Sequence, residues 1–188
     1  MQYKAKTGDH VGSGLITRPG ILHRAKARGL WSVVCFDAEG REKWTDQFEN
    51  IITNVGLDHL LDVTLSAAAA NATWYVGLAD STPTPAAGDT MVTHAGWTEI
   101  TAYSETLRQT WTEAGVSSQS ITNSASKATF SINGSATTGG AFLVSNSTKG
   151  GTTGILYAIG VFAEGDRVVV NGDTVQVTAT FTMADDGV

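Results

Sequence analysis

The clearest pattern in the chain lies near its C-terminus, where apolar and polar residues alternate over ten positions. The polar positions are mostly Thr, and the apolar ones are Val175, Val177, Ala179, Phe181 and Met183. A period of two is typical of a β-strand with one buried face and one wet face. The dipeptide Asn171-Gly172 precedes this run and favours a tight type I′ turn. We therefore predict a hairpin that ends in a long strand with a Thr-rich outer face.

Further apolar runs, separated by Gly, Pro, Asn and Asp, predict strands through most of the chain. They cover residues 30–36, 41–52, 73–79, 97–111, 127–132, 141–144 and 155–162. The run 155–162 is apolar at odd and even positions alike, which is typical of a central strand covered on both faces. About eight or nine strands at spacings of roughly 8 to 15 residues indicate an all-β chain, an antiparallel β-sandwich or jelly-roll-like domain.

One short helix is expected among these strands. Its apolar positions recur at helical spacing and are Leu57, Leu60, Leu61 and Leu65. Either Thr53 or Asn54 can cap the N-terminus of this helix with its side-chain oxygen. The segment 80–89 contains Pro83 and Pro85, so we expect a long loop there.

Composition supports a β-rich fold and indicates in which cellular compartment the chain is made. Its 188 residues suit one domain with an arm, and charged residues make up only 16% of them. No apolar run reaches the roughly 20 residues that cross a bilayer, so we expect no membrane partner. The N-terminus lacks the apolar segment of a secretory signal, which predicts that the chain is synthesised in a cytoplasm.

The charges are distributed unevenly along the chain. Residues 1–30 hold six basic side chains and only one acidic one, Asp9, for a formal charge of +5, whereas residues 31–188 carry −11. The basic residues are Lys4, Lys6, Arg18, Arg24, Lys26 and Arg28. We therefore expect two parts, an extended basic arm over 1–30 and a β-sandwich or jelly-roll body over 31–188.

Such an arm can bind an acidic surface or be a solvated tail without a partner. Nucleic acid is the weaker candidate, because the arm has no aromatic residues between its basic ones and the acidic body would repel phosphates. An acidic protein surface fits the charges better, and we expect no nucleic-acid partner.

The sequence holds few candidates for chemistry. There is no Gly-x-Ser-x-Gly elbow and no phosphate-binding loop, so no catalytic residue is expected. The single cysteine, Cys35, lies in an apolar run and predicts a buried thiol. The four histidines are not at metal-ligand spacing, so we expect no metal and no cofactor.

One stretch combines acidic and aromatic residues, a combination that is also found on sugar-binding surfaces. Its members are Trp97, Glu99, Tyr103, Glu105, Trp111 and Glu113. Packing and solvated acids are the ordinary interpretation, and a carbohydrate-stacking surface and a carboxylate pair for glycoside hydrolysis among Glu99, Glu105 and Glu113 are the alternatives. His94 is either a hydrogen-bonding partner of a loop carbonyl or a contact residue at an interface.

Five segments of the chain carry a family resemblance. They are NIITNVGLDHLL (50–61), YVGLADSTPTPAAGDTM (75–91), HAGWTE (94–99), AYS (102–104) and GDTVQVTATFT (172–182). Together they resemble small virion structural proteins of tailed bacteriophages, within which the chain is most similar to capsid decoration, or cement, proteins. The resemblance spans roughly residues 48–183 and leaves the basic arm outside it.

The resemblance implies a non-enzymatic protein on the outer surface of a bacteriophage capsid, synthesised in the host cytoplasm. It would stabilise the shell by bridging subunits of the major capsid protein. We expect the body to self-associate as a dimer or trimer and residues 1–30 to clamp to the capsid protein. If they are partly exposed, Trp97 and Tyr103 are the expected aromatic anchors, together with His94. A phage tail or neck component and a carbohydrate-binding β-sandwich module are the alternatives.

Overall fold

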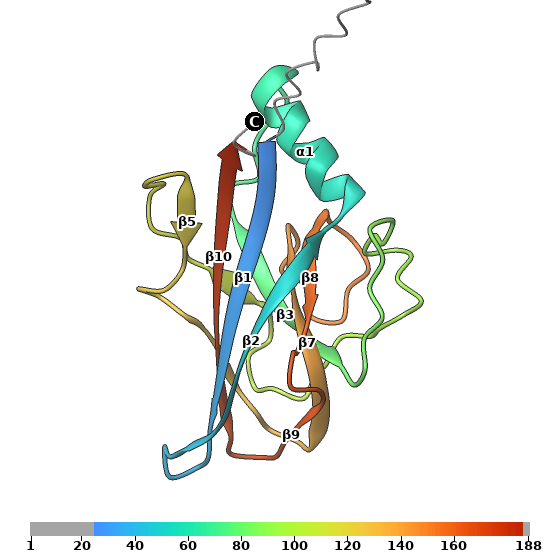
Figure 1. Ribbon diagram of the computed structural model, residues 1–188. Helices are drawn as coiled ribbons and strands as arrows, with labels where there is room; N and C mark the ends of the chain where they lie inside the picture. Colours follow the sequence, from blue (N-terminus) through green and yellow to red (C-terminus); the bar gives the residue numbers. More distant parts are fainter. Residues whose placement is uncertain (1–24, 186–188) are drawn as a thin grey trace, which may run out of the picture.

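The computed structural model describes residues 25–185 and shows a mostly β chain with one short helix (Figure 1). Ten antiparallel strands form one curled sheet. The elements are β1 (Ala25–Phe36), β2 (Glu42–Ile52), α1 (Asn54–Leu65), β3 (Trp74–Asp80), β4 (Gln109–Trp111), β5 (Ser120–Thr122), β6 (Ala128–Ser131), β7 (Ala136–Val144), β8 (Leu156–Val161), β9 (Arg167–Val169) and β10 (Thr174–Asp185). The all-β, antiparallel prediction is confirmed, and the finer sandwich or jelly-roll assignment stays a prediction.

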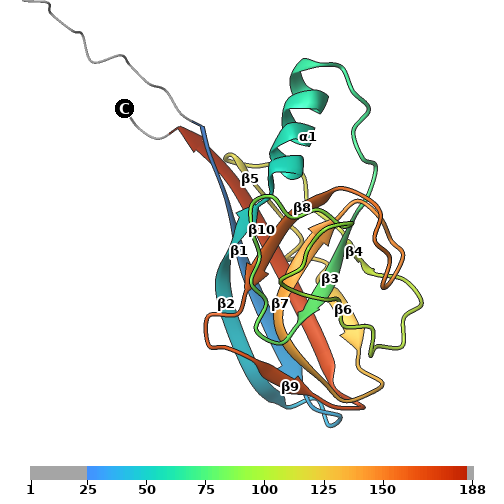
Figure 2. The same ribbon diagram turned by 90° about the vertical axis from the view of Figure 1, so that its right-hand side faces the viewer.

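The sheet curls because β2 pairs with different strands along its length. Its earlier residues pair with β1 in a register that sets Trp31 opposite Phe48, whereas Asn50–Ile52 pair with β8. The strand order is β4-β3-β7-β8-β2-β1-β10-β5, with β6 on β10 and β9 on β7. Seen from the side, β1 and β2 lie on one side of the molecule and β3, β7 and β8 on the other (Figure 2).

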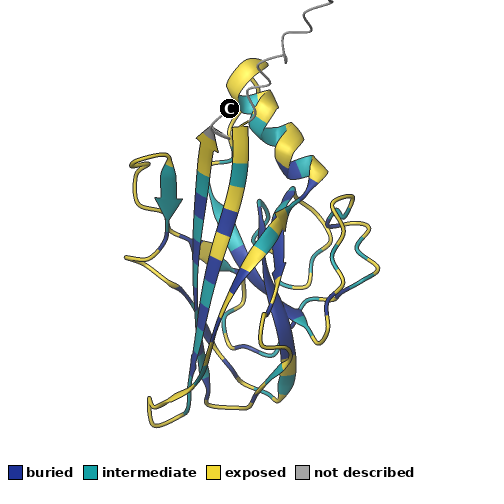
Figure 3. Cartoon of the chain, viewed as in Figure 1, coloured by how far each residue is buried: buried dark blue, intermediate teal, exposed yellow. Residues whose placement is uncertain are grey.

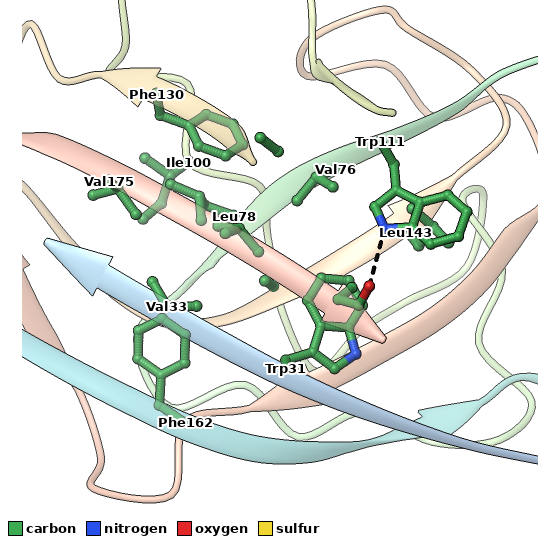
Figure 4. Close-up of a cluster of buried hydrophobic side chains, with 14 of the residues drawn as sticks. Trp31, Val33, Val76, Leu78, Ile100, Trp111, Phe130, Leu143, Phe162 and Val175 are labelled. Atoms are coloured by element: carbon green, nitrogen blue, oxygen red, sulfur yellow. Dashed lines mark hydrogen bonds between the residues drawn. The ribbon is translucent and has the colours of Figure 1, made fainter. Parts of the chain in front are cut away.

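The main core fills the inside of this curl. Side chains from β1, β3, β6 and β10 meet there, among them Trp31, Val76, Phe130 and Val177, all fully buried. Trp111 closes one side, since its indole Nε1 donates a hydrogen bond to the carbonyl oxygen of Ala179 at 3.3 Å (Figure 4). The edge strand β4 is thereby tied to the middle of β10.

A second, smaller cluster lies on the opposite face of β7 and β8. Phe142, Leu156 and Ile159 pack there against Met91 and Trp97, which come from the loops between β3 and β4. These loops cover the face that would otherwise meet water. The prediction that the run 155–162 is covered on both sides is therefore confirmed for β8.

The alternation in β10 has the predicted outcome as far as Phe181, whereas Met183 at the end of the strand is 46% exposed. Val175, Val177 and Ala179 are fully buried, while Thr174, Thr178 and the other intervening polar residues are half-buried on the outer face. The same alternation of buried and more exposed positions is visible along β1 (Figure 3). Charged and apolar residues on the outer face of these strands thus meet solvent, not the core. The predicted hairpin across Asn171-Gly172 is wrong, because β9 pairs with β7 and not with β10.

The predicted boundary between arm and body at residue 30 falls inside a strand. β1 begins at Ala25, and its first residues pair with the end of β10, with Ala25 opposite Asp185 and Leu30 opposite Thr180. Lys26 and Arg28 therefore belong to the body, because their backbones are part of the ladder. The other four basic residues of the proposed arm, Lys4, Lys6, Arg18 and Arg24, lie outside the described residues.

The predicted strand over 97–111 is wrong for most of its length. Only Gln109–Trp111 forms a strand, and the preceding residues make isolated bridges, such as that between Glu99 and Ala79. Their aromatic and β-branched side chains are buried by loop packing. A composition typical of strands therefore reflects burial here, although these residues form no continuous β-ladder.

Gly77 in β3 provides a test of the packing between the two clusters. A Cβ at this position would lie 2.1 Å from Cζ of Phe142, whose buried ring is held by Trp97 at a centroid distance of 4.9 Å. We expect Gly77→Ala to lower the free energy of unfolding by about 1–3 kcal/mol in urea titrations. The control is Gly115→Ala, where a Cβ meets nothing within 4 Å. Equal stability of the two variants would contradict this packing.

Candidate functional site

The helix α1 lies at one end of the molecule, and much of it is exposed (Figure 3). Leu57, Leu61 and Leu65 are 42%, 57% and 81% exposed. A spacing of four places their side chains on one face of the helix, so they form a continuous surface. Exposed apolar patches of this kind mark interaction sites on folded proteins. Asp58 and Asp62 are also exposed on α1, and we call these five residues the α1 face.

The start of α1 is fixed to β8, which turns this face away from the body. Thr53 caps the helix, since its Oγ1 accepts a hydrogen bond from the backbone N–H of Gly56 at 3.1 Å and donates one to the carbonyl oxygen of Leu156. Gly56 lies so close to β8 that a Cβ there would be 2.5 Å from the carbonyl oxygen of Tyr157. Of the two predicted caps, Thr53 is the one used.

The space beneath α1 is incompletely filled. A cavity of about 210 Å³ lies between Leu60 and Val63 of the helix and the rings of Trp74, Trp111 and Tyr157. His59 borders it, with Nε2 3.0 Å from the side-chain nitrogen of Asn71. The helix thus contacts the body through a few residues, and three of its six apolar side chains, Leu57, Leu61 and Leu65, remain exposed.

The outer face of β1 at the same end carries basic and apolar groups. Leu30 is half exposed, and Arg28 forms an exposed ion pair with Glu49. This hydrogen-bonded contact with Arg28 lowers the pKa of the Glu49 carboxyl. A shallow hollow of about 270 Å³ is lined by Arg28, Leu30, Thr180 and Thr182, and we call it the β1 hollow.

Two of the three aromatic anchors predicted from the sequence are buried in the body. Trp97 is 3% exposed and Tyr103 is fully buried, so neither can anchor a partner. The Trp97 indole Nε1 donates to Asp89 at 3.1 Å, and the Tyr103 ring packs edge-on against Phe130. Sequence composition could not distinguish aromatic residues under a loop from aromatic residues on a surface.

His94 is half-buried and has the loop-carbonyl role that we left open. Its Nδ1 lies 2.9 Å from the carbonyl oxygen of Trp97, and its ring stacks on the indole of that residue at 4.0 Å. Both contacts are local to the loop. His94 therefore fixes the loop over the second core cluster.

A buried ion pair holds the loops on this side, and sequence analysis missed one of its members. Arg108 is fully buried, and its Nε and Nη2 donate to the Glu99 carboxylate at 3.0 and 2.8 Å. The same guanidinium donates to the carbonyl oxygens of Asn146 and Gly151. Nothing in the local sequence marks Arg108, because its partners come from separate loops.

This arrangement weighs against a sugar-stacking surface on the residues named above. Trp97, Tyr103 and Trp111 are all buried, Glu99 is used by Arg108, and the Glu105 carboxylate accepts a hydrogen bond from the backbone N–H of Ser131. Stacking on a sugar ring needs an exposed aromatic face. These residues stabilise the body instead.

Replacing Arg108 should destabilise the fold, because it leaves a buried charge without a partner. In Arg108→Ala the Glu99 carboxylate would remain buried without its partner, and we expect the free energy of unfolding to fall by about 3–5 kcal/mol. The matched change is Arg41→Ala, which removes an exposed ion pair with Asp37 and should cost less than about 1 kcal/mol. Chemical denaturation of both variants measures the difference, and similar losses would contradict the structural role of Arg108.

The predicted burial of Cys35 is confirmed, and burial raises the pKa of its thiol from near 9 to about 12. Between these values the unfolded chain has lost the thiol proton while the native chain keeps it, so stability falls as pH rises. We expect the free energy of unfolding to decline above pH 9 by an extra ~1.4 kcal/mol per pH unit relative to Cys35→Ala. Denaturation of both proteins between about pH 8 and 10.5 tests this slope, and parallel pH profiles would contradict it.

Within residues 25–185, no three His, Cys, Asp or Glu side chains gather closely enough to hold a metal ion. No helix in that part of the chain has the length and apolar character needed to cross a membrane. No protein-family model and no curated protein matches the chain.

Proposed function

We propose that the chain is a non-enzymatic structural protein of a tailed-bacteriophage virion that binds the outside of the capsid. In this role it stabilises the shell by bridging subunits of the major capsid protein. The observation that supports this most directly is the exposed α1 face, which offers a protein-interaction surface for contacts between neighbouring copies on the shell and lies at the end of the molecule where β1 begins.

The distribution of charge supports the same role. Lys4, Lys6, Arg18 and Arg24 precede β1, with Asp9 as their single acidic neighbour, whereas the body is strongly acidic. The basic segment is attracted to an acidic protein surface, whereas the acidic body is not. The two parts can therefore make different contacts. The segment binds the shell, and the body supplies shape and lateral contacts.

The described part of the chain favours this role over a carbohydrate-binding module. Trp97, Tyr103 and Trp111, the aromatic residues that the sequence suggested for sugar stacking, are buried, and the exposed apolar side chains of α1 are aliphatic. Aliphatic surfaces suit protein partners, whose own apolar groups they cover. A tail or neck component would share these features and is distinguished by its abundance in the particle.

Neutralising the basic segment should weaken binding to capsids. We expect Arg18→Gln/Arg24→Gln in the full chain to raise the dissociation constant for undecorated shells by about tenfold and to reduce its salt dependence. The matched control, Arg41→Gln/Lys127→Gln, removes the same charge from the body and should bind like the unmodified chain. Co-sedimentation with purified shells at several salt concentrations measures both. Equal binding of the two variants would remove the assigned role of the segment.

Copy number separates the head from the tail. Quantitative mass spectrometry of purified particles should find the chain in a simple ratio to the major capsid protein. A few copies per particle would assign it to the neck or tail, and its absence from particles would reject a virion role.

A further inference from the structure

We propose that copies of this chain associate through two unlike surfaces, with the α1 face of one copy packed on the β1 hollow of another. This contact does not depend on the capsid role, because it rests on two surfaces of the body alone. Both surfaces lie at the same end of the molecule and differ in chemistry. The proposed partner is a second copy of the chain.

The α1 face supplies the projecting half of the contact. Its three leucines project from one side of the helix, and the neighbouring Asp58 and Asp62 are exposed. No Lys or Arg occurs between Asn54 and Leu65, and His59 borders the cavity beneath the helix, so the exposed helix surface is apolar and acidic. A complementary surface needs a shallow apolar recess and positive charge.

The β1 hollow has both properties. Leu30 provides an exposed apolar floor beside Thr180 and Thr182, and Arg28 stands at its edge. Lys26 is exposed on the same outer face, two residues before Arg28 on the strand. Arg28 is already ion-paired with Glu49, but both side chains are more than half exposed, so the guanidinium can engage a second carboxylate at little cost.

The α1 face cannot reach the hollow of its own copy. Leu60, on another side of the helix, lines the groove that Arg28 also borders, while Gly56 and Thr53 hold the helix in that orientation. The three exposed leucines therefore point away from β1 of the same chain. Contact between the two surfaces requires another molecule.

Packing of one α1 face against another α1 face is disfavoured by charge. Such a symmetric contact would place Asp58 and Asp62 near the same carboxylates of the partner, with no Lys or Arg on either helix. Contact between the α1 face and the β1 hollow of another copy instead sets these carboxylates near Lys26 and Arg28. Because both surfaces lie at the same end, two copies that exchange both contacts form a closed dimer, whereas copies that contact a different neighbour through each surface close into a ring when the rotation allows it.

The experiment is a charge exchange in the full chain, followed by sedimentation velocity up to about 100 µM, where contacts of moderate affinity are populated. Asp58→Lys/Asp62→Lys should weaken self-association by about tenfold or more, and so should Lys26→Glu/Arg28→Glu. The chain that combines all four changes should recover association, since the two surfaces have exchanged sign. Circular dichroism confirms that each variant is folded.

A pair of polar substitutions tests the apolar half of the contact. Leu61→Asn should abolish association, whereas Val168→Asn, at the far end in β9, should leave it unchanged, although the two residues are 57% and 60% exposed. The proposal is overturned if the unmodified chain stays monomeric or if reversing the α1 charges strengthens association. It is equally overturned if the folded four-fold variant does not recover.

Discussion

The pairing of β1 with β10 is the constraint on which the rest of the structure depends. It runs without a break from Ala25 opposite Asp185 to Phe36 opposite Thr174, and so fixes which side chains of both strands face inward. Trp31 and Val177 enter the core through this register, and a shift by one residue would expose both. β2 on one side, and β5 and β6 on the other, are aligned to this pair.

The far side of the sheet is stabilised by a different device. There the loops before β4 and after β7 cover β7 and β8, and the buried pair of Glu99 and Arg108 ties these loops together. An ion pair of this kind is a costly way to gain stability but a specific way to fix a loop, since only one arrangement satisfies all its hydrogen bonds. The far side of the sheet thus combines the ladders that pair β3, β7 and β8 with side-chain contacts from the loops that cover it.

Sequence periodicity identified the strands whose burial is regular and failed where burial comes from loops. The alternation in β10 and the two-sided apolar run of β8 were predicted, because each pattern reports a local geometry. The strand expected over 97–111 was wrong for most of its length. The condition that Trp97 and Tyr103 be partly exposed is not met, since they pack on Phe142 and Phe130, which are distant in the chain. The leucines of α1 were placed on a helix correctly, but no local pattern reveals that three of them face solvent.

The antiparallel register of β1 and β10 also determines how the domain responds to mechanical force. Ala25 and Asp185 lie side by side, so tension applied through the two ends of the described chain pulls the strands apart from that end. The hydrogen-bonded pairs of the ladder then break one after another, starting at that end. The force does not act on all of them at once, as it would if the strands were sheared along their length. Tension across these ends would therefore peel away both strands of the central pair before it strained the loops held by Arg108.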